Sequence, residues 1–189
     1  TLIFHAALAA QKSYIVVTSR KDGTQIQFRG VQEFYGAKKA RDGGWLAEYN
    51  ENAGKELLWT DFDIEHKTVL LVEGDISPLD LAKGRFNAKV KAIASKEWCD
   101  DYIICYCSGV NFRYEVAKIQ PYKSGRAEKP LLHAQLTEWM LKRYKDKLVT
   151  DKDIETDDLV AILMAQDRKK HKGDKDKLEY VLAYIDKDL

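Results

Sequence analysis

The sequence has little cysteine. Its 189 residues include three cysteines, Cys99, Cys105 and Cys107, an odd count in a chain large enough to fold without disulfides. Cys105 and Cys107 would lie on one face of a strand, where neighbouring positions are poorly placed to bridge. A C-x-C pair without a second Cys or His cluster is also a weak metal signal. We therefore expect buried thiols in a reducing cytoplasm.

Long apolar runs are also missing, since no stretch approaches the ~20 residues that a membrane helix needs. The apolar opening from Thr1 to Ala10 lacks a basic start and is soon interrupted by Gln11-Lys12, unlike a signal peptide. It also lacks an initiator Met and resembles the middle of an element, so we expect further chain before Thr1. We predict a monomer without a membrane partner in the cytoplasm of a bacterial or phage-infected cell.

The chain has almost no net charge, because 31 Lys and Arg nearly balance 30 Asp and Glu to give +1. The total therefore predicts no nucleic-acid partner, but the distribution is uneven. The segment from Arg113 to Lys147 carries an excess of +5, which leaves −4 for the rest. A basic segment followed by acidic clusters suits a protein that holds phosphates and binds metal ions. A solvated, lysine-rich helix face is the alternative.

Short apolar runs alternate with helical patterns. A hairpin is predicted around Asp22-Gly23, followed by an insertion of short helices and loops over 30–67. Buried strands are predicted over 68–73, 101–107 and 178–185. Helices are predicted over 2–11, from Ser77-Pro78 towards Trp98, over 131–148 and over 157–169. This alternation predicts one α/β domain over 1–189 with a mainly parallel central sheet and helices on both faces.

Two acidic clusters stand out. Glu155, Asp157 and Asp158 open a predicted helix, and Asp186 and Asp188 follow a predicted strand. Each has a structural explanation alone, because acidic residues cap helix starts and Asp-Lys-Asp suits a solvated turn. Helix starts and strand ends share one rim of a parallel α/β sheet, however, so the five carboxylates are expected to converge there.

Such crowding of carboxylates raises their pKa values unless cations compensate the repulsion. Carboxylate oxygens suit Mg²⁺ or Mn²⁺, and two such ions about 4 Å apart can clamp both oxygens of an in-line phosphodiester displacement. In the basic segment, Lys123 and Arg126 are spaced to contact one phosphate from a single helical face. An aromatic side chain such as Tyr122 can stack on a base. An ordinary charged surface loop is the alternative.

Four motifs in order carry a resemblance to a known family. They are Asn111-Phe112-Arg113, Tyr122-Lys123-Ser124-Gly125-Arg126, Glu155-Thr156-Asp157-Asp158-Leu159 and Asp186-Lys187-Asp188-Leu189. Their order resembles that of the 5′ nucleases: the 5′–3′ exonuclease domain of bacterial DNA polymerase I, the flap endonucleases and the phage 5′ exonucleases. The resemblance extends from about Cys107 to Leu189.

The resemblance implies a PIN-like nuclease core with a basic helical arch over 111–147. It implies a 5′–3′ exonuclease or flap endonuclease that hydrolyses DNA, or the RNA of a hybrid, with two Mg²⁺ or Mn²⁺ ions. The metal ligands would be Glu155, Asp157, Asp158, Asp186 and Asp188, with Asp157 and Asp186 central to catalysis. Lys123 and Arg126 would hold the scissile phosphate, and Arg113 and Tyr122 would also contact DNA.

The chain departs from the family pattern in three places. The family carries an Asp just before a helix like 2–10, which we expect upstream of Thr1. A second family Asp is expected where this chain has Ser108-Gly109. The helix–three-turn–helix region that grips duplex DNA is expected after Asp188.

Two other functions remain open from the sequence. A PIN-type ribonuclease shares the α/β core and the acidic site, although the Tyr-Lys-x-x-Arg segment argues against it. A non-catalytic nucleic-acid-binding module with a decayed site would explain the missing Asp residues, whereas the five retained carboxylates oppose it.

Overall fold

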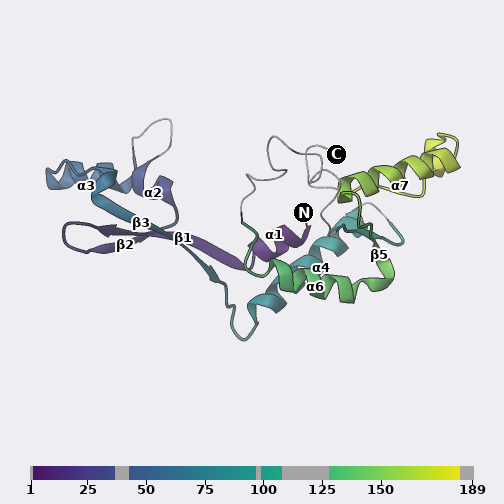
Figure 1. Cartoon of the computed structure of the whole chain (residues 1–189), viewed down its shortest axis with the longest axis horizontal. Coiled ribbons are helices and arrows are strands. Elements are labelled where there is room, and N and C mark those ends of the chain that lie inside the picture. The colour runs from purple at the N-terminus through teal and green to yellow at the C-terminus, as the bar shows by residue number, and fades with distance from the viewer. Residues whose placement is uncertain (1, 37–42, 97–98, 108–127, 184–189) are drawn as a thin grey trace. The chain divides into compact units, whose positions relative to one another are not determined.

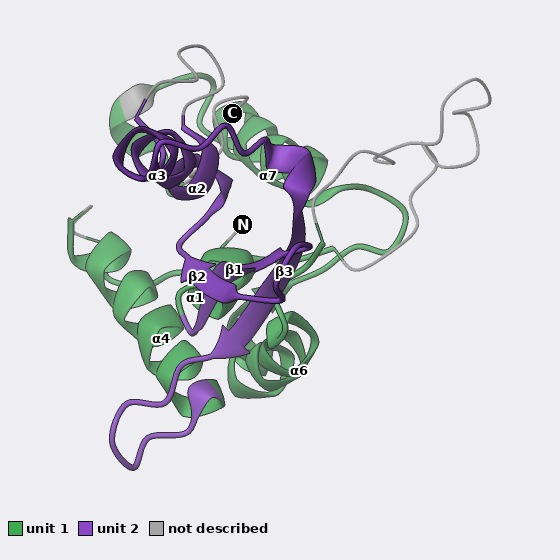
Figure 2. Ribbon diagram, turned by 90° about the vertical axis from the view of Figure 1, so that its left-hand side faces the viewer, with its two compact units in different colours: residues 1–9, 79–189 green, residues 10–78 purple. Residues whose placement is uncertain are grey.

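The computed structural model describes residues 2–36, 43–96, 99–107 and 128–183. The sequence predicted one domain, but the chain forms two compact units (Figure 2). One unit consists of residues 10–78, and the other consists of residues 1–9 and 79–189. Helices and sheets occur together, so the chain belongs to the α/β class. No helix within the described ranges has both the length and the apolar character needed to cross a membrane.

The unit of residues 10–78 is built on an antiparallel sheet of order β2-β1-β3, formed by β1 Gln11–Ser19, β2 Gln25–Phe28 and β3 Phe62–Leu70. The predicted hairpin is confirmed between β1 and β2. Gly23 adopts a positive φ of 73° in its turn, a region that glycine enters without steric cost. The Asp22 carboxylate accepts a hydrogen bond from the Thr24 N–H at 3.0 Å.

Two short helices, α2 Val31–Tyr35 and α3 Trp45–Ala53, lie on one face of this sheet (Figure 1). Phe34 of α2 is fully buried and packs against Phe28 and Phe62, with ring centroids 5.4 and 5.3 Å away. Trp45 stacks on Tyr49 at 4.8 Å. The core of this unit is therefore an aromatic cluster between the helices and the sheet.

The prediction of a buried parallel strand over 68–73 is wrong. β3 starts earlier, at Phe62, inside the segment suggested as an insertion, and pairs antiparallel with β1 from Ser19↔Phe62 to Gln11↔Leu70. Val69 and Leu70, at its end, are exposed by 42% and 38%. The first half of the apolar run, 68–70, is thus the end of a longer strand that begins at Phe62.

Three of the helices of the other unit are α1 Leu2–Leu8, α4 Pro78–Lys96 and α6 His133–Arg143. α4 begins at Pro78, as predicted from a proline at the first helical position. Its buried Phe86 meets Trp139 and Tyr144 with ring centroids 5.9 and 5.6 Å away. The helices predicted over 2–11, from Ser77-Pro78 onwards and over 131–148 are confirmed, and α1 and α6 end before their predicted last residues.

A short parallel pair joins β4 Ile104–Cys105 to β5 Leu148–Val149, and α7 Thr156–Lys170 follows β5. The strand predicted over 101–107 is therefore confirmed in its centre. The mainly parallel sheet with helices on both faces is not confirmed, because the larger described sheet is antiparallel. Residues 178–183 have no regular secondary structure, and the rest of that predicted strand lies outside the described residues.

Replacing Phe34 by Ala should lower the free energy of unfolding by about 3–5 kcal/mol, as large-to-small changes in cores do. Urea unfolding followed by tryptophan fluorescence measures the change. Val31→Ala on the same helix is the control, because Val31 is 40% exposed and its replacement should cost at most ~0.5 kcal/mol. Equal losses for the two variants would contradict the aromatic core.

Candidate functional site

The start of α7 carries three of the five predicted metal ligands. Glu155 is the N-cap residue, and Asp157 and Asp158 lie in the first turn. The Glu155 N–H donates a hydrogen bond to the Asp158 carboxylate at 3.3 Å. Asp158 therefore caps the helix, which was the structural explanation of this acidic cluster. Asp157 is exposed, whereas Glu155 and Asp158 are half-buried.

This acidic turn lies beside the carboxyl ends of the parallel pair. The Cys107 N–H, two residues after β4, donates to the Thr156 hydroxyl oxygen at 3.1 Å. The Tyr106 N–H extends the pairing of the strands by donating to the Val149 carbonyl at 3.0 Å. Helix start and strand ends thus share one rim, which we call the α7 rim: Glu155, Thr156, Asp157, Asp158 and Cys107.

The remaining predicted site residues lie outside the described residues. They are the metal ligands Asp186 and Asp188, the phosphate-contacting Lys123 and Arg126, and the DNA-contacting Arg113 and Tyr122. Ser108, where a family Asp was expected, also lies outside. Convergence of all five carboxylates therefore stays a prediction.

The thiols beside the α7 rim are free cysteines. Cys105 and Cys107 are half-buried, and burial, followed by the neighbouring Cys107, raises the pKa of the Cys105 thiol. A raised pKa keeps the thiol protonated and makes it a poor metal ligand at neutral pH. The prediction of buried thiols is wrong for Cys99, which is exposed.

A second cluster of ligating groups was missed from the sequence. Asp167, His171 and Glu179 are the one group within the described ranges in which three such side chains bring their ligand atoms within 4.8 Å of one another. The spacing Asp167-x-x-x-His171 places two of them on one helical face and was a readable signal. Glu179 follows α7 in a segment without regular structure, and no sequence pattern pointed to it.

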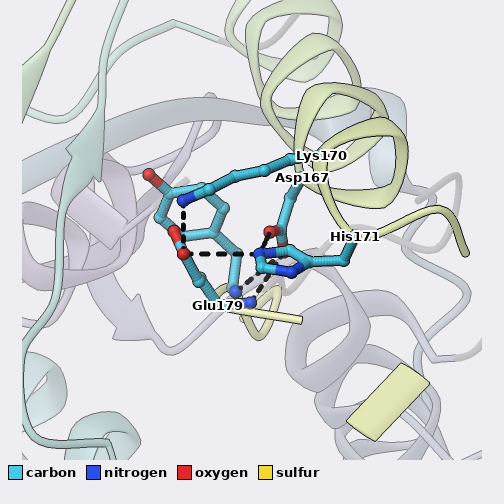
Figure 3. Close-up of polar contacts among 5 residues, drawn as sticks. Asp167, Lys170, His171 and Glu179 are labelled. Atoms are coloured by element: carbon cyan, nitrogen blue, oxygen red, sulfur yellow. Dashed lines mark hydrogen bonds and ion pairs between the residues drawn. The ribbon is translucent and has the colours of Figure 1, made fainter. Parts of the chain in front are cut away.

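Asp167 lies at the centre of this cluster (Figure 3). Its side chain is only 1% exposed, and its Oδ2 accepts the backbone N–H groups of Glu179 and Tyr180 at 2.9 and 3.1 Å. Its Oδ1 lies 3.5 Å from His171 Nε2 and has no hydrogen-bond partner among the described residues. A buried carboxylate therefore fixes the chain after α7 and turns one oxygen towards His171.

Glu179 completes the cluster with its carboxylate. Its Oε1 lies 3.3 Å from His171 Nε2 and also accepts a hydrogen bond from the Lys170 ammonium group. The Lys170 hydrogen bond is the largest cause that lowers the pKa of Glu179. Both groups are solvent-accessible, so this ion pair contributes little to stability, but it keeps the carboxylate ionised.

No family model matches the chain, and neither a curated protein nor a solved structure shows a significant match to it. The resemblance to 5′ nucleases therefore stays an interpretation of the motifs.

Asp167→Ala should destabilise the unit, because it leaves the N–H groups of Glu179 and Tyr180 without their acceptor. We expect a loss of about 1–3 kcal/mol for each buried N–H that finds no other partner, measured by urea unfolding. Asp153→Ala serves as the control, since Asp153 is exposed and precedes α7. Equal stability of the two variants would mean that Asp167 does not hold the segment after α7.

Proposed function

We propose that this chain is the core of a divalent-metal-dependent 5′ nuclease that hydrolyses DNA phosphodiester bonds, as a 5′–3′ exonuclease or flap endonuclease. The observation that carries the proposal is the α7 rim, where an acidic helix start lies at the carboxyl ends of two parallel strands. In α/β folds this is the edge at which ligands bind. The β4–β5 pair would then be part of a PIN-like parallel sheet.

The donor set of the α7 rim fits Mg²⁺ or Mn²⁺. Glu155, Asp157 and Asp158 offer only carboxylate oxygens, the ligands that these ions prefer. Asp186 and Asp188 would complete the set for two ions. The metal ions would supply charge stabilisation for the attacking and leaving oxygens of the phosphodiester.

The protein residues have to hold the DNA against this negative site. In the described part of the basic segment, Lys142 pairs with Glu138 at 2.7 Å and Lys147 pairs with Asp101. These two lysines are therefore engaged with carboxylates, and the resemblance to the 5′ nucleases points to Lys123 and Arg126 for the phosphate contacts. Arg113 and Tyr122 would contact neighbouring nucleotides of a DNA strand or of an RNA–DNA hybrid.

Cleavage of a 5′-flap DNA substrate should require Mg²⁺ or Mn²⁺ and stop on addition of a chelator. Asp157→Ala should lower the single-turnover rate by at least about 10²-fold. Removing a residue that only hydrogen-bonds to a metal ligand already lowers metal affinity or activity by about 10- to 100-fold. DNA binding should change far less, since metal ions act mainly on the transition state.

Asp153→Ala is the matched control, an exposed aspartate just before α7, and should cleave at the parent rate. Full turnover by Asp157→Ala would contradict the assignment of the α7 rim. Binding of flap DNA without any cleavage by the intact protein would favour a non-catalytic module instead.

Lys123→Ala should lower the cleavage rate by on the order of 10²-fold, as removal of one charge-stabilising donor does. The salt dependence of DNA binding should change only by about one phosphate contact. Lys142→Ala is the control, because Lys142 is exposed and paired with Glu138. If Lys123→Ala cleaves like the parent and loses only affinity, the residue positions DNA without a catalytic role.

A further inference from the structure

The cluster at the end of α7 differs in chemistry from the α7 rim. Asp167, His171 and Glu179 combine two carboxylates with one imidazole, whereas the α7 rim offers oxygen ligands alone. We propose that these three residues form a separate binding site for one divalent transition-metal ion, with Zn²⁺ preferred. The proposal does not rest on the nuclease function, because none of the three residues belongs to the predicted catalytic set.

Two of the three separations between the ligand atoms match those around a tetrahedral ion, and all three lie within 4.8 Å. Zn²⁺ binds imidazole nitrogen and carboxylate oxygen at about 2.0–2.2 Å, and two such ligands at the tetrahedral angle lie about 3.3–3.5 Å apart. His171 Nε2 lies 3.3 Å from Glu179 Oε1 and 3.5 Å from Asp167 Oδ1. The 3.3 Å separation also allows a hydrogen bond between the imidazole and the Glu179 carboxylate, which a metal ion bound to His171 Nε2 would replace.

Asp167 is oriented as a metal ligand would be. Two backbone N–H groups hold its Oδ2, and such outer contacts fix the direction of a ligating carboxylate. Its buried Oδ1 faces the cluster without a hydrogen-bond partner among the described residues. A buried carboxylate oxygen without a hydrogen bond is costly, and a bound cation would satisfy it.

Lys170 already contacts the Glu179 carboxylate, but an ionised carboxylate has about four acceptor positions and can serve both cations. Three protein ligands leave a fourth position for water. The imidazole favours Zn²⁺ over Mg²⁺ and Ca²⁺, which prefer all-oxygen sites.

The ion would tie Glu179, eight residues beyond His171, to the end of α7. A metal bound by the folded chain alone stabilises that state by mass action. The bound ion would thus hold in place the start of the segment that leads in sequence to Asp186 and Asp188.

The test is a calorimetric titration of the metal-free full chain with Zn²⁺ in the presence of excess Mg²⁺. We expect one Zn²⁺ per chain and a rise in Tm on binding. His171→Gln and Glu179→Gln should each weaken Zn²⁺ binding at least about 10-fold. His66→Gln, which alters an exposed histidine of β3, should bind like the parent, as should Cys105→Ser.

Substitution by Co²⁺ adds a direct readout of the ligands. The expected spectrum shows the visible bands of four-coordinate Co²⁺ without a sulfur-to-cobalt charge-transfer band. The proposal is overturned if the parent binds no Zn²⁺, if His171→Gln and Glu179→Gln bind it like the parent, or if cysteine ligation dominates the spectrum. If His171→Gln fails to fold, the Zn²⁺ affinity of Glu179→Gln decides whether the proposal holds, because Glu179 is half-exposed. The absence of a Zn²⁺-dependent rise in Tm would equally overturn the proposal.

Discussion

The hydrogen bond from the Cys107 N–H to the Thr156 hydroxyl is the contact on which the functional interpretation depends. It joins the chain after β4 to the first turn of α7, and the parallel pairing of β4 with β5 sets the direction of both strands. Without it, the acidic residues of that turn would be an ordinary helix cap. With it, they lie at the edge where an α/β fold binds its ligands.

One helix carries both proposed sites. The first turn of α7 offers oxygen ligands and an exposed Asp157, which suit hard cations. Its last turn carries the buried Asp167, which holds the following segment through two backbone N–H groups. That segment leads in sequence to Asp186 and Asp188. The contacts that hold it therefore affect whether all five predicted metal ligands can come together.

Local signals predicted the fold well where one residue type determines the backbone. Asp22-Gly23 predicted the hairpin, and Pro78 marked the start of α4. The sequence failed where distant pairing decides: residues 68–70 of the apolar run end an antiparallel strand and pair with 11–13, far earlier in the chain. In the site, the acidic start of α7 was predictable, whereas Glu179 reaches Asp167 through an irregular segment that no periodicity describes.

The most direct test of the α7 rim is to locate a bound metal ion in solution. Mn²⁺ broadens the NMR signals of nearby backbone amides, so a titration of labelled protein at low Mn²⁺ maps the site without any substrate. Our account predicts the strongest broadening at Cys107 and at 155–159. Broadening spread evenly over surface carboxylates, or absent from Cys107 and Thr156, would contradict it.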